Sequence, residues 1–81
     1  MKIGTQIKIK SVAIHTQLGE VNWISRAVVT KVTATQVDYE IVETLGGTGP
    51  AADAPFIGGT GGMALAMVGF LKKHGRLEVL A

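Results

Sequence analysis

The alternation of apolar and polar residues along the first part of the chain constrains its fold more than any other sequence feature. Between residues 2 and 10, lysine and glutamine occupy the even positions apart from Gly4, while isoleucine and threonine occupy the odd ones (Ile3, Thr5, Ile7 and Ile9). Successive side chains of a strand point to opposite faces of a sheet, so this pattern is typical of a half-buried strand. The same alternation over residues 37–44 puts Val37, Tyr39 and Ile41 inward and Asp38 and Glu40 outward.

Two further features predict how these strands connect. At Ser11 the alternation shifts by one residue, because Val12 and Ile14 now hold the apolar positions, and such a shift indicates a β-bulge or a bend. Gly19 lies in the polar segment 17–20 and is free to adopt a positive φ, so we predict a turn there.

Residues 21–34 are rich in β-branched side chains on both faces and are predicted to form the central strand.

The second part of the chain changes character. Residues 46–62 are rich in glycine and repeat one tetrapeptide, since Gly46-Gly47-Thr48-Gly49 recurs as Gly58-Gly59-Thr60-Gly61; we predict a loop. A helix is predicted over 63–75, with an apolar stripe of Met63, Ala64, Met67, Phe70 and Leu71. Gly75 would end this helix, and residues 76–81 would form a last strand.

The predicted fold is therefore one mainly β (α+β) domain over residues 1–81. An antiparallel β-meander (1–45) forms a small SH3-like barrel or sandwich, followed by the glycine-rich loop, the helix and a short strand. The positions of Gly4, Trp23, Ala27, Val29 and Tyr39 resemble those of Tudor-type barrels. That resemblance concerns topology alone.

Composition predicts self-association. The chain has 81 residues, no cysteine, 47% hydrophobic residues and only 17% charged residues, against a usual charged share of about 25%. Without cysteine, neither a disulfide nor a cysteine zinc site can stabilise so small a domain. Few charges also imply exposed apolar surface. We therefore expect a homo-oligomer.

The charged and aromatic residues suggest a binding face rather than an active site. Basic residues dominate before residue 35, and Trp23 and Tyr39 would accompany them on the sheet. Such a face suits a protein or a single-stranded nucleic acid; its candidate residues are Trp23, Tyr39, Lys8, Lys10, Arg26 and Lys31. No serine or threonine has a base nearby in the sequence. The carboxylates Asp38, Glu40 and Glu43 are expected on solvated surface, with Glu43 facing opposite to the other two. An enzyme is not the favoured interpretation, and no catalytic residue or metal site is predicted.

Residues 55–81 offer an alternative. The run from Ile57 through the glycines to a helix and a strand resembles the nucleotide-binding start of short-chain dehydrogenases and ketoreductases. Gly58 and Gly62 match the family's glycines, whereas Ala64 stands where a third glycine is usual. The resemblance implies that a phosphate or nucleotide binds at Gly58, Gly59, Thr60, Gly61 and Gly62. Because the sequence closes at Ala81, we expect phosphate binding without complete dehydrogenase chemistry.

A third interpretation concerns membranes. Residues 54–71 contain no charge and reach the length of a membrane span of about 18 residues. Their glycines make the segment only weakly hydrophobic, so an interface helix is favoured over a membrane-active segment. The N-terminus enters a charged strand without a secretory signal, so the default expectation is a cytoplasmic protein. The leading hypothesis is a non-enzymatic binding or assembly module without a cofactor.

Overall fold

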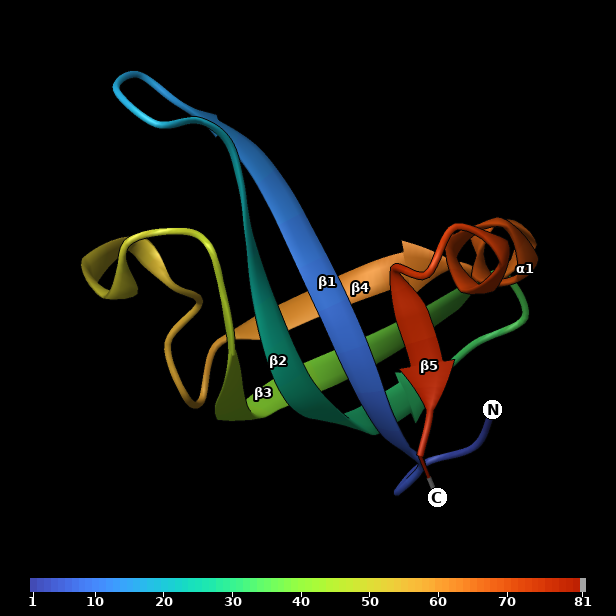
Figure 1. Ribbon diagram of the computed structural model, residues 1–81. Coiled ribbons are helices and arrows are strands. Elements are labelled where there is room, and N and C mark those ends of the chain that lie inside the picture. Colours follow the sequence, from blue (N-terminus) through green and yellow to red (C-terminus); the bar gives the residue numbers. More distant parts are fainter. Residues whose placement is uncertain (81) are drawn as a thin grey trace.

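The fold of this protein is given by a computed structural model, which describes residues 1–80. Its five strands form one antiparallel sheet in the order β4-β3-β2-β1-β5 (Figure 1). This confirms a mainly β domain with one helix and a short C-terminal strand. The elements are β1 (Gln6–His15), β2 (Gly19–Val32), β3 (Gln36–Gly47), the 3-10 helix η1 (Ala51–Asp53), β4 (Thr60–Ala64), α1 (Leu65–Lys73) and β5 (Leu77–Val79).

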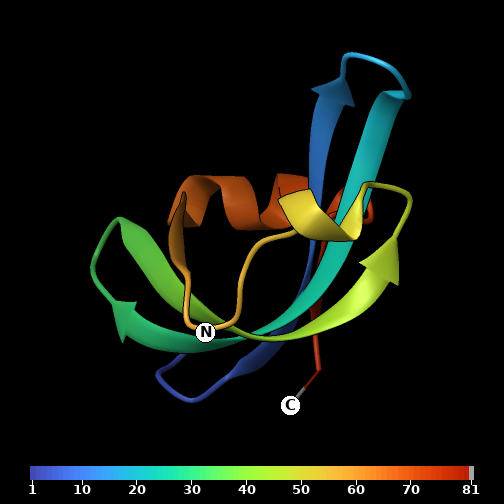
Figure 2. The ribbon, with the colours of Figure 1, turned by 90° about the vertical axis from the view of Figure 1, so that its left-hand side faces the viewer.

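Strands β1 and β2 form a long hairpin whose far end stands away from the rest of the sheet (Figures 1 and 2). Gly19 closes it with a φ of 76°, as predicted. The predicted bulge at Ser11 is wrong, because the pairing runs without interruption from Gln6↔Val28 to His15↔Gly19. The alternation therefore continues, and Ile14 lies on the same face as Lys8, 79% exposed.

The irregularities lie instead between β2 and β3. Register shifts occur between Ile24 and Ser25, between Arg26 and Ala27, and between Val29 and Lys31. One of them brings Glu43 opposite Arg26, although Glu40 pairs with Val28 on that same face. The prediction that Glu43 faces opposite to Glu40 is therefore wrong, because one extra residue of β3 resets the alternation.

The inner face of the sheet carries the core. The buried cluster consists of Ile7, Ala27, Val29, Val37, Ile41 and Leu77, which come from β1, β2, β3 and β5. The inward positions predicted for Val37, Tyr39 and Ile41 are confirmed, with Tyr39 packed at the edge of the cluster. Leu65, Val68 and Leu71 of α1 cover this cluster, and Figure 2 shows α1 on the concave side of the curved sheet.

The glycine-rich region differs most from the prediction. Residues 60–64 are not loop and helix but strand β4, which pairs with β3 from Glu40↔Thr60 to Gln36↔Ala64. Glycine is a poor strand former, yet here two glycines make room for neighbours. A Cβ on Gly61 would come within 2.5 Å of the Tyr39 hydroxyl oxygen, and one on Gly62 within 2.8 Å of Asp38 Oδ1. Side chains of β3 thus lie directly over the glycine backbone of β4.

Helix α1 is shorter than predicted and buries another face. It begins at Leu65 rather than at residue 63, and its core-facing residues are Leu65, Val68 and Leu71. Of the predicted stripe, Met67 and Phe70 are exposed. The predicted end at Gly75 is confirmed: Gly75 has a φ of 70°, and the Arg76 N–H donates to the Leu71 carbonyl at 2.8 Å. In β5, Leu77 and Val79 face inward opposite Ile9 and Ile7, as predicted. Ala81 lies outside the described residues.

Candidate functional site

Exposed apolar side chains are the most distinctive property of the surface. Within residues 1–80, twelve large apolar residues are exposed, whereas only seven hydrophobic residues are buried. Isolated apolar residues on a surface are ordinary, and only a structured group points to a binding site. Phe56 and Ile57 are adjacent, 76% and 67% exposed, and directly precede the uncharged strand β4.

The apolar turn, defined as Phe56–Gly59, is fixed to the sheet. The Gly59 N–H donates to the Phe56 carbonyl at 3.0 Å, and Gly58 has the positive φ of 89° that closes such a turn. The Gly58 N–H donates to the Ile41 carbonyl, and the Ile41 N–H donates to the Gly59 carbonyl, both at 2.8 Å. The sheet therefore holds two exposed apolar side chains in one place, which lowers the entropy cost of binding through them.

Strand β4 continues from this turn as one edge of the sheet. The Leu65 N–H donates to the Thr35 carbonyl and the Ile41 N–H to the Gly59 carbonyl, so alternate residues between them also bond to β3. The backbone groups of Thr60, Gly62 and Ala64 consequently point away from β3; we call them the open edge. Proteins usually protect such an edge with lysine, proline or a bulge, and β4 has neither lysine nor proline.

The predicted phosphate loop maps onto this same segment. Gly58 and Gly59 belong to the apolar turn, and Thr60, Gly61 and Gly62 belong to β4. Two residues separate Gly62 from the first residue of α1, and Ala64 at the N-cap makes no side-chain hydrogen bond. Phosphate or nucleotide binding here stays a prediction. Sequence reasoning singled out the repeat but missed the strand, because the only inward apolar side chain within β4 is Met63.

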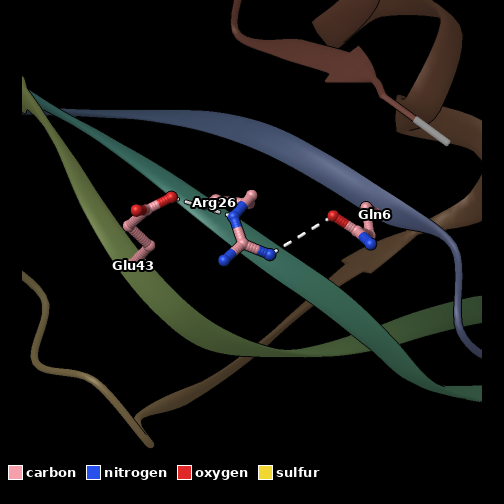
Figure 3. Close-up of polar contacts among 3 residues, drawn as sticks. All are labelled: Gln6, Arg26 and Glu43. Carbon is pink, nitrogen blue, oxygen red and sulfur yellow. Dashed lines mark hydrogen bonds and ion pairs between the residues drawn. The ribbon is translucent and has the colours of Figure 1, made fainter.

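The residues of the predicted binding face lie on two faces of the sheet. Lys8, Lys10 and Arg26 lie on the outer face, whereas Trp23 is opposite Ser11 and Tyr39 is opposite Val29 on the inner face. The basic residues are also partly neutralised. Arg26 Nε donates to Glu43 Oε1 at 2.9 Å and Nη1 donates to Gln6 Oε1 at 3.2 Å, as Figure 3 shows across three strands. Lys8 pairs with Glu78 at 3.2 Å, and Lys31 stands opposite Asp38.

Trp23 holds the connection after β3 in place. Its Nε1–H donates to the Pro50 carbonyl at 2.9 Å, and its ring lies so close to Gly49 that a Cβ there would collide with it. The Asn22 carbonyl accepts from the N–H groups of Thr48 and Gly49, each at 2.9 Å. The first Gly-Gly-Thr-Gly copy is thus tied to β2, as the second is tied to β3.

Tyr39 is a half-buried titratable group on the inner face of the sheet. Burial raises the pKa of its hydroxyl above the ordinary value of 10.0, because the charged phenolate loses solvation. The folded state therefore keeps the proton to a higher pH than the unfolded state does. The resulting contribution to stability is complete below about pH 10 and is lost as the pH rises through the raised pKa.

This shift predicts the alkaline behaviour of the protein. Because Tyr39 is the only tyrosine, tyrosinate absorbance should report a single group that titrates above its value in the unfolded chain. The free energy of unfolding should fall with pH in that range, and more steeply than in Tyr39→Phe. Identical slopes in the two proteins would contradict the burial of this hydroxyl.

Residues 1–80 contain neither a cluster of metal-ligating side chains nor a helix that could span a membrane. No group of three or more histidine, cysteine, aspartate or glutamate side chains is placed to hold a metal ion. His15 Nδ1 accepts the N–H of Gln17 in the hairpin turn, and His74 stacks on Phe70 with ring centres 4.2 Å apart. No helix in this part of the chain is long and apolar enough to cross a membrane.

Comparisons with known proteins give no relative. No family model, no curated protein and no solved structure matches this chain.

Proposed function

We propose that the protein is a non-enzymatic β-domain that acts by self-association, with the open edge of β4 and the apolar turn as its interface. The observation that carries this proposal is the uncharged run from Phe56 to Ala64, in which an unprotected edge strand follows a hydrogen-bonded turn with two exposed apolar residues. We also propose that the strand order reflects an SH3-like barrel, since α1 lies between the edge strands β4 and β5.

The partner in this proposal is a second copy of the chain. An antiparallel pairing about Gly62 brings Thr60 of one copy opposite Ala64 of the other, so the same backbone groups satisfy each other on both sides of a two-fold axis. The pairing directs each apolar turn toward the start of the other copy's α1, where Met67 is exposed. Burial of apolar residues on both sides then stabilises the dimer.

Two substitutions test this interface while sparing the fold. Ala64 has a φ of −67°, which proline adopts without strain, so Ala64→Pro removes an N–H of the open edge and leaves the bonds to β3 intact. Ile57→Asp places a charge on the apolar turn at an exposed position. Light scattering and native mass spectrometry over a concentration series should show a wild-type dimer. Each variant should weaken it by about thirtyfold, as expected for about 2 kcal/mol at an interface centre.

Ile14→Asp is the matched control, because Ile14 is equally exposed but lies on the β1–β2 hairpin. Its dimer should be unchanged. A wild-type monomer at the highest concentration reached would refute self-association. Loss of the dimer in Ile14→Asp alone would move the interface to the hairpin.

A further inference from the structure

A cavity of about 250 Å³ lies between the inner face of the sheet and the C-terminal part of α1. Its walls come from four strands and the helix, and they are mainly apolar, with Ile9, Met63, Leu71 and Leu77 among them. Four residues with polar side-chain groups join this wall: Ser11, Tyr39, Arg76 and Lys10, the last of which occupies an outer-face position of β1.

Arg76 gives the cavity its charge. Its Nε is buried and has no hydrogen-bond partner, and no aspartate or glutamate lines the cavity. A buried donor on a charged group that lacks an acceptor is destabilising, so an acceptor that reaches it is favoured. The backbone of residue 76 is held in place, because the Arg76 N–H donates to the Leu71 carbonyl at 2.8 Å and its carbonyl accepts the Lys10 N–H at 3.0 Å.

The hydroxyl of Tyr39 adds a second polar group from the opposite wall. Its ring lies over Gly61, which leaves the oxygen 2.5 Å from where a Cβ of that glycine would stand. This hydroxyl is protonated at neutral pH, as any phenol with a pKa of 10.0 or above is, so it is a donor. A guanidinium and a neutral phenol suit one oxyanion.

We propose that this cavity binds a small carboxylate with a short hydrocarbon chain, whose carboxylate accepts from Arg76 and Tyr39 while the chain lies against Ile9, Met63 and Leu77. The apolar walls favour a carboxylate over inorganic phosphate, because phosphate would leave them without a partner and would lose more hydration. The site adjoins the proposed dimer interface at Gly62, which lines the cavity beside Met63, whereas Phe56, Ile57 and Ala64 do not line it.

Titration with pentanoate, followed through the NMR signals of the Met63 and Leu77 methyl groups and by calorimetry, tests the proposal. Pentanol supplies the chain without the charge, and inorganic phosphate supplies the charge without the chain. We expect saturable binding of pentanoate that is at least about tenfold tighter than that of either probe, which is about 1.4 kcal/mol.

Substitutions of Arg76 then test whether its charge binds the carboxylate. Arg76→Gln keeps the backbone hydrogen bonds of residue 76 and should weaken pentanoate binding by at least about tenfold, while Arg76→Lys should weaken it less. Lys73→Gln removes an exposed cation of the same helix end and should leave binding unchanged. Equal affinity of Arg76→Gln and wild type, or no saturable binding of pentanoate by wild type, would overturn the proposal. Should Arg76→Gln fail to fold, the wild-type comparison decides: pentanol or phosphate binding as tightly as pentanoate would also overturn it.

Discussion

Replacing Ile7 by alanine should destabilise the protein by about 2–5 kcal/mol, the range for large-to-small substitutions in a packed core. Ile7 is fully buried and lies in β1 between Ala27 of β2 and Val79 of β5. Sheet pairing on both sides leaves the surrounding backbone little freedom to close the cavity. Because a domain of this size has only about 5–15 kcal/mol in total, much of the folded population should be lost on mild heating.

Chemical denaturation followed by Trp23 fluorescence measures this effect, at one low protein concentration so that association does not change the apparent stability. Ile14→Ala is the control, since it removes the same atoms from the same strand at a position that is 79% exposed. Its effect should stay within about 0.5 kcal/mol. Similar losses of stability in both variants would contradict the exposure of Ile14 on the hairpin.

Gly47→Ala should cost at least about 3 kcal/mol, from overpacking and backbone strain together. Gly47 has a φ of 127°, and an added Cβ would stand 2.7 Å from Trp23 Cα and collide with the Asn22 carbonyl. These atoms are backbone and cannot rotate away. The same carbonyl accepts from Thr48 and Gly49, so moving it also disrupts the connection that follows β3.

Gly46→Ala separates the two causes. Gly46 also has a positive φ, of 147°, but a Cβ there would meet nothing within 4 Å. It should cost only the strain, about 1 kcal/mol. Thermal unfolding measures both variants, with a shift of about 4–8 °C expected for each kcal/mol. Equal shifts would show that close packing on β2 contributes nothing.

Local patterns predicted those parts of the fold that depend on neighbours in sequence. The alternation gave the correct faces from Val37 to Ile41, because the extra residue of the register shift there lies in β2, and it failed at Glu43, which follows the extra residue of β3. Gly19 and Gly75 were predicted correctly because their positive φ values are a backbone property of glycine. The candidate site was less accessible, since β4 has the sequence Thr-Gly-Gly-Met-Ala and shows no alternation of apolar and polar side chains that would predict a strand.

Tertiary structure decided the features that depend on packing. In the sequence, the shift in alternation between Ile7 and Ile14 suggests a bulge, yet the pairing of β1 with β2 continues unbroken. As a result Ile7 lies in the core on the inner face, whereas Ile14 lies on the outer face. Which face of α1 is buried was likewise set by contact with the sheet, because both faces of this helix are apolar.

The first half of the chain determined its strands by itself, since a period of two and a turn glycine suffice to specify a hairpin and a third strand. The glycine-rich second half of the chain did not determine its strand by itself. Its residues 60–64 have little strand propensity of their own, and they form β4 because Tyr39, Gln36 and Asp38 lie against glycines that have no side chain. The open edge, the apolar turn and the Arg76 cavity all follow from that packing, which acts between residues far apart in the sequence.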